Sequence, residues 1–279
     1  MTYHTATDAW VYLLTNVAIL GERQKPRGLE TRELLGYQFR VDMEYPVVNV
    51  KARELGFRFL AAEAFWILNG DNRVSTISPF SKAIANFSDD GVYFAGAYGP
   101  RVVDQLSYVV DQLVADPSTR QAVLTIWRPN PRPSKDIPCT IACQWLIRPH
   151  WETKEPALYC IDTMRSSDAW LGVPYDVFNF SQLSLRIALL LRNRGLLVRL
   201  GGLVLQAGSQ HLYEKDWEAA RKIITGPGLD PEPDLKVNPH FKVSEFADPE
   251  THLDFLSHAL NDGRSWFEAA WPAEEGSQK

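Results

Sequence analysis

The stretch MRSSDAWLGVPYD occupies residues 164–176, between a region rich in β-branched residues and a long apolar region with helical spacing. Within it, the segment GVPYD brings an acidic residue, Asp176, to the edge of the apolar region. A carboxylate at such a place is either a solvated turn residue or a group that faces a ligand in a pocket. In the second case its charge decides which ring the protein accepts.

The regions on either side of this stretch predict a strand over 157–165 and a helix over 178–195 that ends at Gly195. Strands and helices mix along the chain without strict alternation, which predicts an α+β fold around one substantial sheet. Further helices are predicted over residues 8–20 behind a Thr7 or Asp8 cap, and over 52–68, 101–115, 211–224 and about 250–260. Further strands are predicted over 34–43, 121–127, 139–148, 196–208 and 234–243.

Composition limits the classes of function. The chain has 279 residues, is 45% hydrophobic and carries a net charge of −5, so nothing indicates a general nucleic-acid binder and any anionic ligand needs local arginines. Its three cysteines, an odd and sparse set, favour a reducing compartment over a disulfide scaffold. The apolar stretch near the N-terminus resembles neither a signal peptide nor a membrane span, so a cytoplasmic location is expected, in a host cytoplasm if the gene is viral.

Two side chains, those of Glu63 and Cys139, are candidates for catalytic roles. Glu63 interrupts the most apolar predicted helix at LAAEAFW, where it is either on a narrow solvent-facing stripe or a partly buried proton-handling group with a raised pKa. Cys139 follows a proline-rich loop and opens a strand, which leaves its thiol exposed and fixed in direction. It is either a small core residue or a nucleophile, and nearby arginines would favour the thiolate that a nucleophile needs. No cysteine or histidine spacing predicts a metal site.

Read together, these motifs resemble the thymidylate synthase family in the family's order. The carrying segments are GYQFRV (36–41), EAFWILNGDN (63–72), AYGPR (97–101), DPSTRQAVLTIW (116–127), IPC (137–139), MRSSDAWLGVPYD (164–176) and GSQHLY (208–213). The resemblance covers residues 8–245. It implies a single domain over 1–279 with a divergent tail from 246 to 279, a large mixed sheet flanked by helices, and a homodimer formed across the sheet.

The resemblance also implies roles for individual residues. Cys139 would add to C6 of a pyrimidine nucleotide, so that C5 attacks the one-carbon unit of methylenetetrahydrofolate, the co-substrate. Glu63 would organise water and proton transfers, and Tyr98 would assist removal of the C5 proton. The remaining roles concern binding: Arg27, Arg165 and Ser166 for the phosphate, Arg120 for the phosphate in the other subunit, His211 and Tyr213 for the sugar, and Asp168, Leu171 and Gly172 for the folate.

Asp176 departs from the family, which has asparagine there. An amide offers uracil both a donor and an acceptor, whereas an ionised carboxylate only accepts and meets uracil O4 with another acceptor. Cytosine presents an N4–H₂ donor that Asp176 can accept, and a proton on N3 or on the carboxylate adds a second hydrogen bond. Asp176 therefore predicts selection of cytosine, as in the deoxycytidylate hydroxymethylase branch of the family.

Further departures concern the fate of the transferred carbon and the phosphate site. The family's loop tryptophan, which helps the folate deliver hydride, is missing from SPFSKAIANFSDDG (78–91), and the apolar closing segment is missing from the chain end. Water would then add to the methylene, giving a 5-hydroxymethyl product and tetrahydrofolate. Gln121 replaces an arginine that binds phosphate, with Arg128 or Arg132 as candidate substitutes, and Ser209 replaces an aspartate.

The favoured hypothesis is therefore folate-dependent hydroxymethylation of dCMP, without a metal, a membrane or nucleic acid. Three alternatives remain at this stage. One is a CMP hydroxymethylase of nucleoside antibiotic synthesis, and another is a divergent thymidylate synthase that acts on dUMP. The third, from a different class, is an inactive nucleotide-binding scaffold.

Overall fold

A computed structural model describes residues 2–226 and 240–262. Its centre is a seven-stranded sheet in the order β1-β3-β7-β6-β5-β4, with β2 added beside β3. The β1/β3 and β6/β7 pairs are parallel and the other pairs are antiparallel, so the sheet is mixed and the fold is α+β as expected. The strands are β1 (Thr2–Tyr3), β2 (Glu22–Gln24), β3 (Thr31–Asp42), β4 (Val123–Thr125), β5 (Thr140–Pro149), β6 (Pro156–Asp168) and β7 (Arg199–Tyr213).

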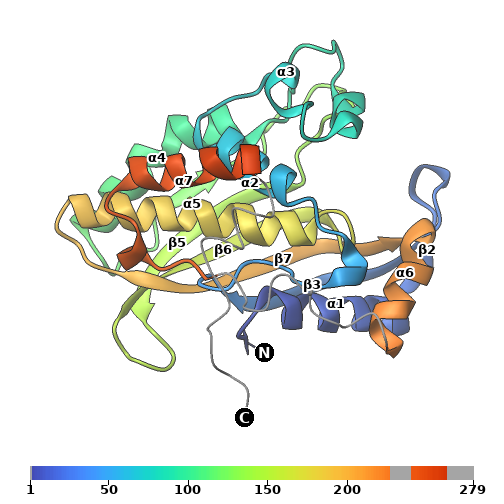
Figure 1. Ribbon diagram of the computed structural model, residues 1–279, viewed down its shortest axis with the longest axis horizontal. Coiled ribbons are helices and arrows are strands. Elements are labelled where there is room, and N and C mark those ends of the chain that lie inside the picture. Colours follow the sequence, from blue (N-terminus) through green and yellow to red (C-terminus); the bar gives the residue numbers. More distant parts are fainter. Residues whose placement is uncertain (1, 227–239, 263–279) are drawn as a thin grey trace.

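Helices flank the sheet in two groups (Figure 1). The long helix α5 packs along β6 and β7, and α2, α4 and α7 pack on α5, while α1 packs along β3 and contacts α6. The α-helices are α1 (Ala6–Leu20), α2 (Phe57–Leu68), α3 (Val74–Ile77), α4 (Tyr98–Ala115), α5 (Val173–Asn193), α6 (Glu214–Thr225) and α7 (Pro249–Asp262). Short 3₁₀ turns are η1 (Pro26–Gly28), η2 (Lys51–Arg53), η3 (Lys82–Phe87) and η4 (Val243–Glu245).

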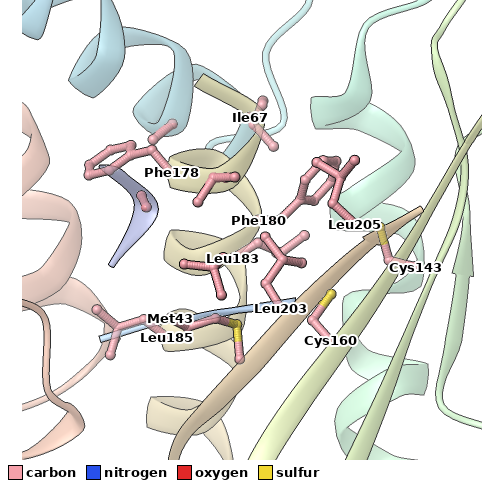
Figure 2. Close-up of a cluster of buried hydrophobic side chains, with 14 of the residues drawn as sticks. Met43, Ile67, Cys143, Cys160, Phe178, Phe180, Leu183, Leu185, Leu203 and Leu205 are labelled. Carbon is pink, nitrogen blue, oxygen red and sulfur yellow. The ribbon is translucent and has the colours of Figure 1, made fainter. Parts of the chain in front are cut away.

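The main core lies between α5 and the sheet. Figure 2 shows side chains of α5 facing the leucines of β7 and two buried cysteines, Cys143 of β5 and Cys160 of β6. Burying such side chains contributes roughly 1.5–3 kcal/mol each, which makes α5 a firmly held element. Because the N-terminus of α5 carries Asp176, this packing fixes where that carboxylate lies.

Several helices begin at residues other than those predicted. Helix α1 begins at Ala6 because the Thr5 hydroxyl, not Thr7 or Asp8, caps it by accepting the Asp8 N–H at 3.1 Å. Helix α2 begins only at Phe57, since Glu54 adopts a left-handed conformation that interrupts the predicted 52–68 helix. Helices α4 and α5 begin earlier than predicted, which places Tyr98 and Asp176 inside first turns.

The predicted helix over 211–224 is wrong at its start. His211–Tyr213 continue β7, because their backbone pairs with β3 from Thr31 to Glu33, and α6 begins at Glu214. Strand pairing thus overrides the local sequence preference. The segment 22–24, for which no strand was predicted, pairs with β3 as β2. Of the predicted 234–243 strand, residues 234–239 lie outside the described residues, and 240–243 form no strand. Helix α7 confirms the predicted 250–260 helix.

Candidate active site

Cys139 lies directly before β5 and is half-buried. Its carbonyl accepts the Arg165 N–H at 2.8 Å, which ties the end of the proline-rich loop to β6. Its Sγ lies 3.7 Å from Ser166 Oγ and 3.8 Å from Arg165 Nη2. The thiol therefore has a fixed position beside a hydroxyl and a guanidinium.

The Arg165 guanidinium is held by the loop that precedes Cys139. Nε donates to the Pro138 carbonyl at 3.0 Å, and Nη2 donates to the Ile137 carbonyl at 2.9 Å. Gly208 lets β7 approach this segment, because a Cβ there would lie only 3.0 Å from the Arg165 carbonyl oxygen. Arg165 and Ser166 lower the pKa of Cys139, but burial outweighs both and leaves that pKa raised. Arg165 thus favours the thiolate as expected, but burial of the thiol has the larger effect.

Glu63 lies on α2 with a half-buried side chain. Burial raises the pKa of Glu63 to about 7, although Asn179 Nδ2 donates to Glu63 Oε2 at 2.8 Å and opposes the shift. The partial burial of Glu63 and its hydrogen bond to Asn179 favour a proton-handling group over a residue on a solvent-facing stripe. A carboxyl with this pKa exchanges its proton near neutral pH, as a general acid-base catalyst must.

We expect Glu63 to impose a pH dependence on stability that a Glu63→Gln variant lacks. The folded chain holds the Glu63 proton up to about pH 7, whereas the ordinary pKa is 4.5, so unfolding releases a proton between these values. The contribution of Glu63 to the free energy of unfolding therefore falls as the pH rises from 4.5 to 7. From pH 4.5 to 7, the melting temperature of the Glu63→Gln variant should therefore rise relative to that of the wild type. Parallel pH profiles would contradict this assignment.

Tyr98 is the first residue of α4, and its side chain contacts the start of β5. Its hydroxyl oxygen accepts the Thr140 N–H at 3.1 Å. Burial raises the pKa of Tyr98 well above its ordinary value, and the charges of Asp176 and Cys139 raise it further. Tyr98 is therefore a neutral phenol that faces both the thiol and the carboxylate.

Asp176 completes the group from the first turn of α5. Gly172 leaves room for its carboxyl, because a Cβ there would lie 3.1 Å from Asp176 Oδ2. Burial raises the pKa of Asp176 well above its ordinary value, and the neighbouring carboxyls Asp162, Glu63 and Asp168 raise it further. Among the described residues, no hydrogen bond to either carboxyl oxygen is present. The carboxyl is thus available to a ligand.

A thiol, a guanidinium, two carboxyls and a phenol converge here from elements far apart in the sequence. The whole-chain comparison agrees with the motifs, because the family model for thymidylate synthase matches residues 8–256. The chain belongs to the thymidylate synthase family. It is 25% identical over 231 residues to the thymidylate synthase of Buchnera aphidicola subsp. Baizongia pistaciae (strain Bp), an alignment that covers 77% of this chain and 83% of that protein. The family acts on a pyrimidine nucleotide with methylenetetrahydrofolate as co-substrate.

The residues that the thymidylate synthase resemblance assigns to folate lie beside Asp176. One carboxyl oxygen of Asp168 accepts the backbone N–H groups of Trp170 and Leu171 at 2.8 and 3.0 Å. This fixes the carboxyl and leaves its second oxygen for N–H donors such as those of a pterin ring. Leu171 is 45% exposed and offers an apolar surface to an aromatic ring. This arrangement fits a folate.

The residues assigned to the sugar lie at the end of β7. The rings of His211 and Tyr213 meet edge to face with centroids 5.1 Å apart. In the sheet register His211 lies opposite Asp168 of β6 and Glu33 of β3. The Ser209 hydroxyl donates to the Glu33 carboxyl, so β3 supplies a carboxylate beside the position where the family has aspartate.

Two predicted phosphate ligands do not join the cluster. Arg27 is exposed in η1 with a φ of 52°, and Arg120 is exposed before β4, where its carbonyl accepts Gln144 Nε2 at 2.8 Å. Within the described part of the chain, no contact joins either side chain to Cys139, Arg165 or Ser166. That Arg120 serves the other subunit stays a prediction.

The sequence alone did not single out Asn179, Thr140 or Asp162, which all adjoin the cluster. For Asn179 the signal was available, since it is a polar residue in an apolar helix, three positions after Asp176. In residues 2–226 and 240–262 no group of histidine, cysteine and acidic side chains is arranged to hold a metal ion. No helix in these ranges has the length and apolarity needed to cross a membrane.

Proposed function

We propose that this protein hydroxymethylates a cytosine nucleotide, converting dCMP, methylenetetrahydrofolate and water into 5-hydroxymethyl-dCMP and tetrahydrofolate. The observation that carries the proposal is Asp176, a carboxyl with no hydrogen-bond partner among the described residues, in a cluster with Cys139, Tyr98 and Glu63. The family position otherwise holds an amide that suits uracil, and the exchange of amide for acid changes which base can pair.

Asp176 selects cytosine through a shared proton. A carboxyl that carries a proton donates to cytosine N3 and accepts from the N4–H₂ group. Cytosine N3 is a base, so it holds this proton even when the carboxyl tends to ionise. Uracil O4 is a very weak base, so ionisation of Asp176 leaves two acceptors face to face. The raised pKa of Asp176 supports the first arrangement, because it favours the protonated carboxyl.

Cys139 supplies the covalent step. Its thiolate adds to C6, the electron pair of the C5–C6 bond moves to make C5 nucleophilic, and the Asp176 proton passes to N3. Arg165 and Ser166 favour the thiolate, because both lower the pKa of Cys139 against the effect of burial. Tyr98 then assists removal of the C5 proton, and Glu63, with a pKa of about 7, exchanges protons with water at the ring.

The folate supplies the one-carbon unit when bound. Asp168, Leu171 and Gly172 would hold it beside the ring, as their positions next to Asp176 support. Loop 78–91 lacks tryptophan, so the chain offers no indole there to exclude water from the exocyclic methylene. After the C5 proton is removed and tetrahydrofolate is released, water adds to that carbon and the Cys139–C6 bond breaks, which leaves a hydroxymethyl group on C5.

The remaining contacts concern the phosphate and the sugar. Arg165 and Ser166 bind the phosphate, since a planar guanidinium matches its oxygens and both groups already adjoin Cys139. His211 and Tyr213 bind the sugar hydroxyl. Arg27 closes over the phosphate from its loop, and Arg120 reaches the phosphate of a second copy.

We propose a homodimer formed across the sheet, in which Arg120 reaches the second copy. In β6 and β7, residues that face α5 are fully buried, whereas the intervening Ile161, Thr163, Val204 and Gln206 on the opposite face remain partly exposed. A second copy would cover them. We also propose one domain over residues 1–279. The hydrogen bonds of Arg58 to Leu260 and of Arg186 to Pro249, which join α7 to the rest of the fold, support it.

A mass-spectrometric assay tests the proposal. Purified protein receives methylenetetrahydrofolate with dCMP, CMP or dUMP, and both nucleotide and folate products are identified. We expect 5-hydroxymethyl-dCMP together with tetrahydrofolate. Preference for CMP would leave the proposed reaction unchanged and show that the substrate is a ribonucleotide rather than a deoxyribonucleotide. Methylated uracil nucleotide with dihydrofolate would make the protein a divergent thymidylate synthase, and no product from any nucleotide would support a nucleotide-binding scaffold.

A further inference from the structure

Asn179 of α5 is a buried amide that none of the steps above uses. The residue is 7% exposed and lies three positions after Asp176 in the same helix. Its Nδ2 donates to Glu63 Oε2 at 2.8 Å, which joins α5 to α2. The other end of the amide, Oδ1, has no hydrogen-bond partner among the described residues. A buried polar atom without a partner destabilises a fold, so stability alone does not explain an amide at this position.

The hydrogen bond from Asn179 decides which oxygen of Glu63 handles protons. Oε2 accepts the amide N–H, and an acceptor must present a lone pair to its donor. Within residues 2–226 and 240–262 no other hydrogen bond reaches the Glu63 carboxyl, and its side chain is only half-buried. A proton that Glu63 takes up is therefore held on Oε1, the oxygen that remains free to bind water or substrate.

Asn179 also fixes where Glu63 lies relative to Asp176. Residues three apart in a helix share one face, and α2 packs on α5, so Asp176, Asn179 and Glu63 lie together. The charge of Glu63 reaches Asp176, because it raises the pKa of that carboxyl. A glutamate side chain has several rotamers, and a hydrogen bond to a buried amide holds it in one of them.

We propose that Asn179 is a positioning residue that holds Glu63 for the addition of water to the one-carbon unit. In this step the water oxygen bonds to the exocyclic carbon, and a water proton passes to Glu63 Oε1. The electron pair of the exocyclic double bond moves to re-form the C5–C6 double bond, and the Cys139 sulfur leaves C6 with the electrons of the S–C6 bond. The inference rests on the proposed function, because this step belongs to it.

Single-turnover kinetics test this role, because they separate removal of the C5 proton from the later water step. Protein in excess over dCMP labelled with tritium at C5 reacts with methylenetetrahydrofolate, and tritium release and 5-hydroxymethyl-dCMP are timed separately. In Asn179→Leu we expect tritium release at the wild-type rate. Product formation should slow by about 10- to 100-fold, less than the ~10²–10⁴-fold that an acid-base catalyst itself contributes. The dissociation constant for dCMP should stay unchanged.

Asn179→Asp is a second variant that keeps the shape of the side chain. It removes the N–H donor toward Glu63 Oε2 and retains an oxygen at each end. We therefore expect the same result as in Asn179→Leu, with fast tritium release and slow product formation. Wild-type rates of both in Asn179→Asp would show that the N–H donor is not needed, and they would overturn the inference.

Gln182→Met is the matched control, because Gln182 is another buried amide of α5 that is bonded at one end. Its Oε1 lies 2.9 Å from His252 Nε2, and its own Nε2 has no hydrogen-bond partner in the described part of the chain. This variant should keep both wild-type rates. Equal slowing of both rates in Asn179→Leu and Gln182→Met would indicate a structural role and overturn the inference, and so would wild-type rates in Asn179→Leu. A wild-type protein that forms no hydroxymethyl product from dCMP or CMP overturns the proposed function and this inference with it.

Discussion

Cys139→Ala is expected to lower turnover by at least about 10⁴-fold, the largest effect of any single substitution in this chain. Alanine removes the only group in the cluster that can form the bond to C6, and without that bond C5 does not attack a one-carbon unit. The substitution removes one sulfur from a half-buried position, so the fold should remain. Product formation by mass spectrometry and trapping of a covalent nucleotide adduct measure the two consequences.

Cys160→Ala is the matched control. Cys160 is a fully buried thiol on β6 that does not line the cluster, so its loss should lower stability slightly and leave turnover unchanged. Nucleotide binding should survive in Cys139→Ala, since Arg165 keeps its hydrogen bonds to the Pro138 and Ile137 carbonyls. Wild-type turnover in Cys139→Ala would exclude the covalent route. Unchanged nucleotide binding with no turnover in either protein would instead support a scaffold.

Asp176→Asn is expected to reverse the preference between cytosine and uracil nucleotides. The amide donates to uracil O4 and accepts from N3–H, but it has no proton to pass to cytosine N3 when Cys139 adds to C6. We expect kcat/KM for dCMP to fall about 100-fold and activity or binding toward dUMP to rise, as expected when buried polar groups gain or lose a partner. Side-by-side kinetics with both nucleotides measure the change.

The pH dependence of this preference gives an independent check. Burial and the neighbouring carboxyls hold the pKa of Asp176 well above its ordinary value, so at low pH the protonated acid pairs with either base. As the pH rises through this pKa, uracil loses its partner first, and the ratio of kcat/KM for dCMP over dUMP should increase. The ratio for Asp176→Asn should stay flat in this range. A wild-type ratio that falls with pH, or unchanged cytosine preference in the variant, would falsify the shared-proton account.

Some of the site could be predicted from residue types and their order. Cys139, Arg165 and Ser166 were identified from two short motifs, and the structure brings all three within 4 Å of one sulfur or of one another. Glu63 could be singled out because a carboxylate in an apolar helix is unusual, but only burial shows that its pKa rises to about 7. The boundaries of α2 and α6 were wrong where a left-handed Glu54 and the pairing of β7 with β3 decide the backbone.

The sequence by itself determined the family and the mixed α+β fold and singled out Asp176, because motif order and hydrophobic spacing are properties of the chain alone. The tertiary structure decided which of these groups lie together and how their pKa values shift. Asp176 and Glu63 lie near one another only because α2 packs on α5, and their pKa values depend on that shared burial. The same holds for Thr140, an ordinary strand residue in the sequence, whose N–H reaches the Tyr98 hydroxyl only because α4 approaches the start of β5. Electrostatic energies depend on distance and on exclusion of water, and both arise only when distant segments pack together.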